Sequence, residues 1–242
     1  MNHSAEALLE LWERGSTEPS PLAAVTLLSA ASGQPQAEVA RLPVGERDLR
    51  LLALYRSLRG RRVEGVSKCP SCGEQVETAF DVDALMAALR EPSAQPLACS
   101  AGRWRATLRL PSTHDLLAVA TLGSQEAMRD ALLRRCIVEA WRGKKPAPVD
   151  DAPRELLDAA EAAMQRADPA GDVRLALTCP ECAHEWEVAL DAATFVRAEV
   201  SSRARQVANE VHLLASAYGW RESDILSMSP ARRQLYISQA YG

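Results

Sequence analysis

The chain has 242 residues, of which 47% are hydrophobic and only 5% aromatic, enough for one large or two small hydrophobic cores. Its formal net charge of −4 gives no overall positive field that would draw it to DNA or to anionic lipid. The N-terminus starts acidic without a long apolar run, and the best apolar run, "LLAVATL" at 116–122, is far too short for a membrane span.

Residues 1–60 carry three helical patterns. They cover residues 4–14, 21–31 and 45–60, and each one runs up to, or ends just before, a glycine. The third places acids early and arginines late, as the helix dipole favours. We therefore expect an N-terminal helical unit over 1–60.

Two short segments of the chain repeat each other. They are "SKCPSCGEQVETAFDVDAL" at 67–85 and "LTCPECAHEWEVALDAATF" at 177–195. Beyond the cysteines, the pairs Glu77/Glu187, Ala79/Ala189 and Asp81/Asp191 match. Apolar and polar residues alternate after each cysteine pair, which is typical of a strand with one buried face. Each copy therefore reads as strand, turn, strand and then helix, with the aspartate as helix N-cap.

The cysteines of the two copies predict one metal site. Two thiolates at C-x-x-C spacing supply half of a tetrahedral shell, and two such pairs supply the closed four-cysteine shell of a structural zinc. The expected ligands of one zinc ion are Cys69, Cys72, Cys179 and Cys182. We therefore expect residues 61–85 and 172–191 to be the two halves of one zinc ribbon. Two separate metals, a redox-active pair or unrelated turns are the alternatives; a redox C-x-x-C usually starts a helix after a strand, whereas these pairs sit in hairpins.

Four residues near or outside the pairs, His184, Ala183, Cys99 and Cys136, are interpreted separately. His184 could be a spare ligand, but four thiolates already fill a tetrahedral shell, which favours a surface role. Ala183 occupies the place of Gly73, where such turns often require positive φ, so the second turn is expected to be strained or built differently. Cys99 and Cys136 stand alone and are expected to keep out of the site.

The segment 86–171 between the ribbon halves is predicted to be a folded, strand-plus-helix subdomain. We expect a strand at 104–110, a helix capped by Ser112 or Thr113, a helix at about 125–141 and a helix at 153–167. The "GKKPAPVDDAP" stretch is expected to be a loop. The predicted fold class is therefore α+β: mainly α, with a small zinc ribbon and this subdomain inserted between its halves.

Residues 192–242 are predicted to form a long helix, about 192–218, followed by a helical tail. The apolar residues of the long helix step by four and three, which predicts a seam for packing along another helix, either within the core or on a partner. The tail is rich in residue types that dominate protein interfaces. The candidate partner-binding residues are Tyr218, Trp220, Arg232, Arg233 and Tyr236. The alternative is that Tyr218 and Trp220 only fasten the terminal helix.

Catalytic motifs are absent from the sequence. The four histidines form no HExxH pattern, and no GxSxG, P-loop or GxGxxG run occurs. A filled four-sulfur shell leaves no position for water or substrate. We therefore expect a protein without enzymatic activity or a small-molecule substrate.

Several segments together resemble a known family. "LPVGERDLRLLALYRSLRGRRVEGVSKCPSCGEQVE", "WRATLRLPSTHDLL", "LTCPECAHEWEVALD" and "EVHLLASAYGWRESDILSMSPARRQLYISQ" are similar, in this order, to the T4-type baseplate proteins and baseplate hub assembly chaperones of contractile phages and phage-like injection systems. The resemblance covers most of the chain from about residue 42. It implies a non-enzymatic role in building the baseplate or its hub, with other tail proteins as partners. The expected location is the cytoplasm during assembly, and incorporation in a virion or injection-system particle is compatible with this role.

Two hypotheses of different class follow. The first is an interaction protein of contractile-tail assembly, in which zinc clamps two distant segments into one scaffold. The second is a zinc-ribbon module that binds nucleic acid or acts in transcription, although only Arg232 and Arg233 are basic on the last helix. Neighbouring sheath, tube and spike genes would favour the first, and salt-sensitive DNA binding the second.

Overall fold

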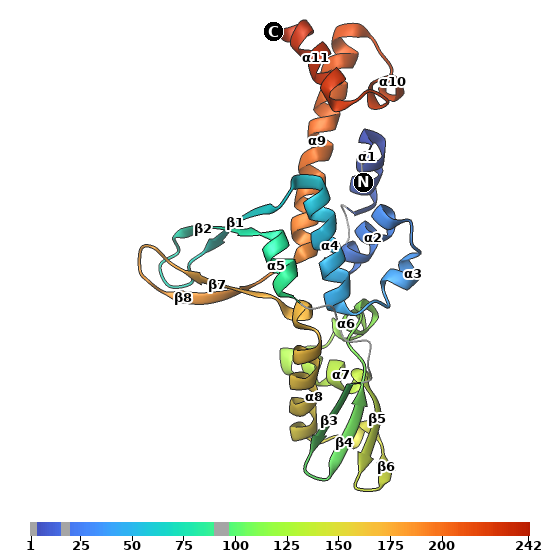
Figure 1. The fold of residues 1–242 in the computed structure, drawn as a ribbon, viewed down its shortest axis with the longest axis vertical. Coiled ribbons are helices and arrows are strands. Elements are labelled where there is room, and N and C mark those ends of the chain that lie inside the picture. Colours follow the sequence, from blue (N-terminus) through green and yellow to red (C-terminus); the bar gives the residue numbers. More distant parts are fainter. Residues whose placement is uncertain (1–3, 16–19, 90–96) are drawn as a thin grey trace.

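The computed structural model describes residues 4–15, 20–89 and 97–242. The molecule is elongated, with a two-hairpin arm that projects sideways from its middle (Figure 1). Most described residues lie in helices, and the strands form three small antiparallel sheets. The mainly helical α+β class predicted from the sequence is therefore confirmed.

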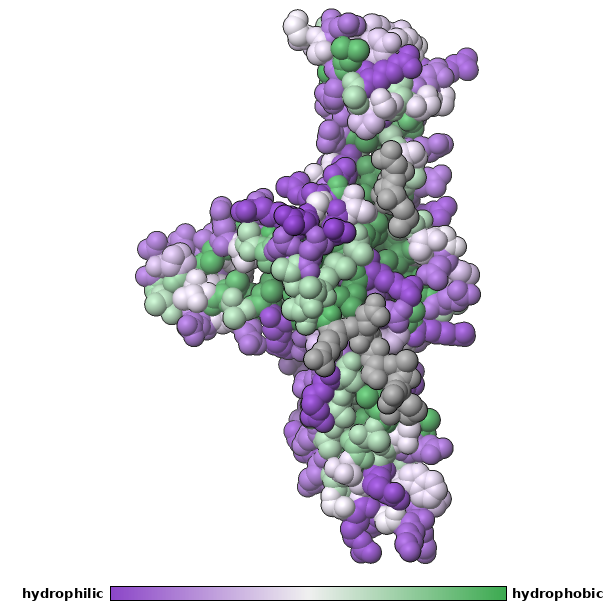
Figure 2. All heavy atoms as spheres, in the orientation of Figure 1, coloured by the Kyte–Doolittle hydropathy of each residue, from purple (hydrophilic) through white to green (hydrophobic). Residues whose placement is uncertain are grey.

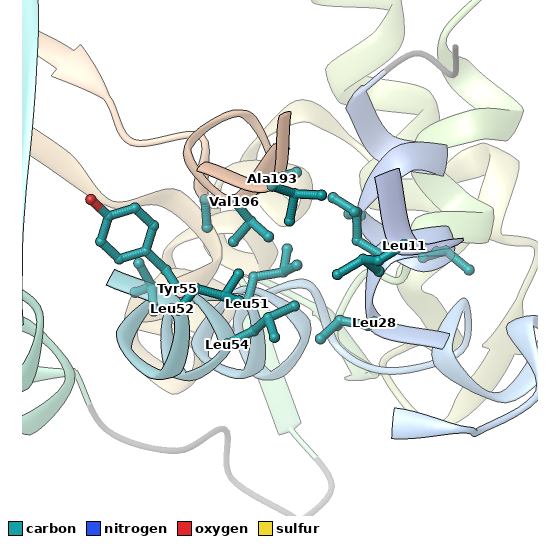
Figure 3. Close-up of a cluster of buried hydrophobic side chains, with 14 of the residues drawn as sticks. Leu11, Leu28, Leu51, Leu52, Leu54, Tyr55, Ala193 and Val196 are labelled. Carbon is teal, nitrogen blue, oxygen red and sulfur yellow. The ribbon is translucent and has the colours of Figure 1, made fainter. Parts of the chain in front are cut away.

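A helical body occupies the middle and upper parts of the molecule. Its N-terminal helices are α1 (Ala5–Gly15), α2 (Ser20–Ser32), α3 (Gln36–Val39) and α4 (Val44–Arg59), and the long helix α9 (Ala192–Tyr218) packs against α1, α2 and α4. Their apolar stripes meet in one core (Figure 3) that includes Leu11, Leu28, Leu51 and Val196. Buried leucine and valine side chains of this kind each contribute about 1.5–3 kcal/mol. The body is therefore held together by contacts between the two ends of the chain.

Helix α9 has the limits expected from the sequence. The side chain of Asp191 accepts a hydrogen bond from the amide of Thr194 at its start, and Gly219 ends it in a left-handed conformation. Its predicted seam is buried along much of its length, from Val200 through Leu214. The seam is therefore packed inside this chain, against the N-terminal helices and the tail.

The arm consists of two hairpins. The first pairs β1 (Arg62–Lys68) with β2 (Gln75–Asp81) and leads into the short helix α5 (Val82–Ala88); the second pairs β7 (Arg174–Thr178) with β8 (Glu185–Ala189). Asp81 caps α5 as Asp191 caps α9, so the repeated aspartate has the same role in both copies. Each hairpin is a separate two-stranded sheet among the described residues. Backbone pairing therefore holds each hairpin internally but does not join the two.

The insert, defined here as residues 97–172, is an antiparallel sheet with a helix on one face (Figure 1). The sheet order is β3 (Leu97–Ala101), β4 (Trp104–Leu108), β5 (Ile137–Arg142) and β6 (Lys145–Ala147). Helices α6 (Thr113–Val119), α7 (Gln125–Cys136) and α8 (Arg154–Ala167) and two 3-10 turns, η1 (Val149–Asp151) and η2 (Pro169–Asp172), complete it. Alternate strand residues face α8 in a separate apolar core.

The structure corrects two predictions in the insert. The helix expected to reach residue 141 ends at Cys136, and Ile137–Arg142 form a strand because they pair with β4. The stretch expected to be a loop contributes β6, which pairs with β5. Isoleucine, valine and tryptophan favour strands, and the available partner strand overrides the helical pattern. The capping prediction is confirmed: Ser112 caps α6 in a capping box with Asp115.

The insert docks on the first turn of α4. The amide of Val44 donates to the carbonyl of Pro111, and the amide of Gly45 donates to Asp168 Oδ2 at 3.0 Å. The buried guanidinium of Arg47 donates to Thr113 Oγ1 at 2.9 Å. Free amides at a helix start need acceptors, and here the insert supplies them.

The tail folds back on the end of α9. Helix α10 (Glu222–Leu226) buries Ile225, and α11 (Pro230–Tyr241) packs along α9. Arg233 is only 4% exposed and donates to Glu210 Oε2 at 2.7 Å and to the carbonyl of Met228. Arg233, expected at a partner surface, is thus turned inward and ties the tail to α9.

In the described parts of the chain, no helix combines the length and apolar character needed to cross a membrane.

Candidate metal centre

The two C-x-x-C turns at the end of the arm have matching backbone geometry. In the first, the amide of Cys69 donates to the carbonyl of Glu74 and the amide of Gly73 donates to that of Cys69. In the second, the amide of Cys179 donates to the carbonyl of His184, and that of Ala183 to Cys179. The repeat detected in the sequence is therefore a repeat of structure.

The two turns bring their four thiols together. Cys69 Sγ lies 3.7 Å from Cys182 Sγ, and Cys72 Sγ lies 3.6 Å from Cys179 Sγ. All four sulfur atoms lie within 4.8 Å of one another. A tetrahedral zinc with bonds of about 2.3 Å requires sulfur–sulfur distances of about 3.8 Å, so the donor set fits such an ion. The same distances are far longer than the roughly 2.05 Å of a disulfide, and all four cysteines are free thiols.

Burial differs in the same way in both turns. The first cysteine of each pair is buried, with Cys69 at 2% and Cys179 at 1% exposure, whereas Cys72 and Cys182 are exposed. The cluster therefore has an inner side against the hairpins and an outer side toward solvent. Four thiolates leave no open coordination position, which is the arrangement of a structural metal site.

The thiols of the first turn differ in proton affinity. Burial by itself raises the pKa of Cys69, but the amides of Cys72 and Ser71 and the neighbouring thiols outweigh it and lower the pKa to about 6. The amide of Glu74 lowers the pKa of Cys72, but contact with the thiols of Cys182, Cys179 and Cys69, together with burial, raises it to about 12. Metal binding by these thiols would therefore release protons.

The arm has little else to hold its outer half together. Its local core contains Cys69, Cys179 and Val76, with Trp186 packed against them. Since the hairpins do not share a sheet in the described residues, the thiol cluster is the main link between their ends. A core this small is typical of units that depend on a metal for stability.

Ala183 is the non-glycine residue with positive φ among the described residues, at 55°, and Gly73 has a φ of 79°. The second turn is thus built like the first and is strained because alanine has a Cβ, as expected from the sequence.

His184, Cys99 and Cys136 lie outside the cluster. His184 is exposed, with its ring stacked on Trp186 at a centroid distance of 6.2 Å. Cys136 is fully buried in the core of the insert, and Cys99 belongs to strand β3 there. The structure therefore groups the same four cysteines that the sequence grouped.

The candidate partner residues of the tail are also clustered. The rings of Tyr218 and Trp220 stack at 4.5 Å, and Tyr236 meets both edge-on. The guanidinium of Arg232 lies 5.7 Å from the ring centre of Tyr236. Tyr218 also donates a hydrogen bond to the carbonyl of Tyr236, so these rings both fasten α11 and remain partly exposed.

The structure shows polar groups that sequence patterns did not single out. Asp115 is almost fully buried and accepts hydrogen bonds from Arg109 and Arg135; burial alone would raise its pKa, but Arg109 and Ser112 hold it far below the usual range. Asp168 is also buried, and its Oδ1 has no hydrogen-bond partner. Asp168 could not be found from the sequence, since the amide that donates to it belongs to Gly45, 123 positions away. Asp115 lies three residues after Ser112, so its place in a capping box is a local signal that the sequence offered.

Comparison with known proteins adds the decisive observation. The family described as T4 bacteriophage base plate protein matches residues 21–195, which include both hairpins and the whole insert. This chain belongs to that family. The match extends over well over half of the sequence and covers all four clustered cysteines. Neither the curated proteins nor the solved structures contain a match.

Membership in the base plate protein family supports a structural role in a phage tail and interaction with other tail proteins. The cysteine cluster lies in the matched part, whereas most of α9, from residue 196 onward, and the tail lie beyond it.

Proposed function

We propose that the chain is a non-enzymatic structural or chaperone-like assembly factor for the baseplate or its hub in a contractile phage tail or phage-like injection system. The observation that carries the proposal is the convergence of four thiols from two hairpins of a base plate family protein. Such an arrangement shapes a scaffold and leaves no coordination position for a reacting group. The same chain would act in the cytoplasm during assembly.

We further propose that Cys69, Cys72, Cys179 and Cys182 hold one Zn²⁺ and that the arm is a zinc ribbon. The metal would supply folding free energy and no chemistry. It would lock the two ends of the insert beside each other, because β2 leads into the insert and β7 follows it. We also propose the domain division expected from the sequence: helical units at 1–60 and 192–242, ribbon halves at 61–85 and 172–191, and a subdomain at 86–171 between the ribbon halves.

The proposed partner surface is the outer side of the tail. Tyr218, Trp220, Arg232 and Tyr236 form its aromatic cluster, and Leu235 is an exposed apolar side chain on α11. Aromatic and arginine side chains bury large areas and keep a polar end, which suits them to interface hot spots. Arg233 is left out because its guanidinium is occupied by Glu210.

The test combines metal analysis with co-purification. The chain is co-expressed with the hub and baseplate proteins of its own gene cluster, captured, and analysed for bound tail proteins and zinc. We expect about one zinc per chain, from one closed shell, and recovery of a hub protein. Finished particles are analysed as well: presence of the chain there makes it a component that is incorporated, and absence makes it an assembly factor only.

Other outcomes would reject the proposal. A folded chain without metal, or with two metals, would reject the shared zinc site. Salt-sensitive DNA binding without capture of any tail protein would favour a zinc-ribbon nucleic-acid module.

A further inference from the structure

The far end of the insert carries a concentration of positive charge. The two turns there, β3–β4 and β5–β6, and the strand ends beside them hold five basic residues: Arg103, Arg105, Arg142, Lys144 and Lys145. The stretches 97–108 and 140–147 contain no aspartate or glutamate, although the chain as a whole has a net charge of −4. Glu139, opposite Thr107 on β5, is the carboxylate next to them. In Figure 2 hydrophilic residues gather at this lower end of the molecule. We call these five residues the basic end.

The two turns are fastened to each other. The amide of Gly143 donates to the carbonyl of Arg103 at 2.7 Å, and Arg105 Nη2 donates to the carbonyl of Gly143 at 3.1 Å. The guanidinium of Arg142 lies 5.9 Å from the ring centre of Trp104. The backbones of the two turns that carry the charges are thus tied to each other.

Carboxylates do not neutralise the basic end. Within the described ranges, none of the five basic residues forms an ion pair, whereas many arginines elsewhere in the chain do. Like charges held together repel each other, so the arrangement gains stability when an anionic group approaches.

A groove adjoins the basic end on the sheet face opposite α8. It has a volume of about 550 Å³ and is lined by Ser100, Arg105, Thr107 and Trp141, among others. Alternate residues of β3 and β4 point to this face, while their neighbours point into the core. The groove thus offers hydroxyl donors, one half-buried indole and one guanidinium beside the basic turns.

We propose that the basic end and this groove bind an acidic, extended segment of a partner protein. Carboxylates of the segment would pair with the lysines and arginines of the turns, and an apolar residue would lie against Trp141. This proposal rests on the proposed function, because that function makes the partner a protein. Single-stranded nucleic acid is disfavoured because its binding platforms stack successive bases on several aromatic rings, and the groove lining presents one.

The test uses the purified full chain and a labelled oligoglutamate peptide of about ten residues. In an extended conformation, at about 3.3 Å per residue, such a peptide is longer than the five-residue strand β3. An oligoglutamine peptide and a single-stranded oligonucleotide of similar length are measured in parallel by fluorescence anisotropy at low salt. We expect the glutamate peptide to bind, the glutamine peptide not to bind and the oligonucleotide to bind more weakly. Binding should also slow hydrogen exchange at 97–107 and 141–147.

Matched variants locate the site. The double substitution Lys144→Gln/Lys145→Gln removes two exposed charges and should weaken peptide binding roughly tenfold. The control Arg166→Gln/Arg205→Gln removes two exposed charges far from the basic end and should leave binding unchanged. Equal losses in both variants, or no binding by the original chain, would overturn the proposal. Tighter binding of the oligonucleotide, lost in the lysine variant, would overturn it in favour of nucleic acid. Zinc content and hub-protein capture test the proposed function independently of these results.

Discussion

The backbone amide of Gly45 donates a hydrogen bond to Asp168 Oδ2, while Asp168 Oδ1 occupies the space where a side chain at position 45 would begin. A Cβ built on Gly45 would lie 1.7 Å from Oδ1 and 2.5 Å from Cγ. These residues are 123 positions apart, and their contact joins the start of α4 to the end of α8. The absence of a side chain at 45 is therefore a condition for docking the insert on the body.

Gly45→Ala should destabilise the protein, although alanine normally stabilises a helix interior relative to glycine by about 1 kcal/mol. The methyl group would displace Asp168 and break its hydrogen bond, so we expect a net loss of about 1–3 kcal/mol. Thermal or urea unfolding measures it. The matched control is Gly123→Ala, where an added Cβ meets nothing within 4 Å and little change is expected. Equal stability of both variants would contradict this interpretation of the contact between Gly45 and Asp168.

The charge on Asp168 should make the stability of the protein depend on pH. Burial raises the pKa of Asp168 above 3.8; the amide of Gly45 opposes this, and the charges of Asp48 and Glu46 add to it. A carboxyl with a raised folded-state pKa destabilises the fold at neutral pH, and this penalty is relieved as pH falls through that pKa toward 3.8. The stability of the original chain relative to Asp168→Asn should therefore increase from neutral pH downward. A difference that stays constant over this range would reject the assignment.

The cysteines should act as one unit in metal binding. Cys69→Ser and Cys179→Ser should each abolish zinc retention and lower the melting temperature by similar amounts, and the double variant should be little worse than either. Cys136→Ser, in the core of the insert, should keep the zinc. Elemental analysis and thermal melts give both quantities. Loss of zinc in Cys136→Ser would show that the ligand set is wrong.

The two turns of the arm offer a pair of opposite substitutions. Ala183→Gly should stabilise the protein, because a non-glycine residue with positive φ carries a penalty of about 1–2 kcal/mol. Gly73→Ala should destabilise it by a similar amount, because Gly73 has a φ of 79°. Both Cβ positions are exposed, so packing changes should be small. Unfolding in the presence of zinc measures the effects, and shifts of the same sign in both variants would argue against backbone strain as their origin.

Neighbouring arginines in the tail should have separate roles. Arg233→Ala leaves Glu210 as a buried charge without its ion pair and should cost about 3–5 kcal/mol. Arg232→Ala removes an exposed side chain and should change stability by about 0.5 kcal/mol or less, while reducing capture of a tail protein. Melting curves and pull-downs separate the two effects. If Arg232→Ala binds partners normally, the partner surface lies elsewhere, for example on the basic end.

The sequence was most informative where local signals and tertiary structure agree. Helix α9 has strong signals at both ends, Asp191 and Gly219, and its limits could be read directly. The four clustered cysteines were found because each turn repeats the same spacing, although their meeting in space depended on pairing segments 110 positions apart. The strain at Ala183 was predictable by comparison with Gly73.

The rest depends on contacts between distant residues. Strands β3 and β6 escaped prediction, and β5 was mistaken for helix, because each is short and gains its hydrogen bonds from neighbours in the sheet. Arg233 was read as a surface residue because its burial depends on how α11 folds against Glu210. The role of Gly45 could not be foreseen, since its partner Asp168 follows it by 123 residues.

The thiol cluster has a consequence for the unfolded chain. Cys72 and Cys179 are separated by 107 residues, so a metal bound by both turns closes a large covalent-like loop. By analogy with a disulfide, closing a loop of about 100 residues reduces the entropy of the unfolded chain by the equivalent of about 4.7 kcal/mol. The insert could then unfold while the metal keeps its two ends beside each other. Its refolding would start from an unfolded chain with fewer accessible conformations. A metal at the end of the arm would thus stabilise the insert by lowering the conformational entropy of its unfolded state, without contacting the side chains in the core of the insert.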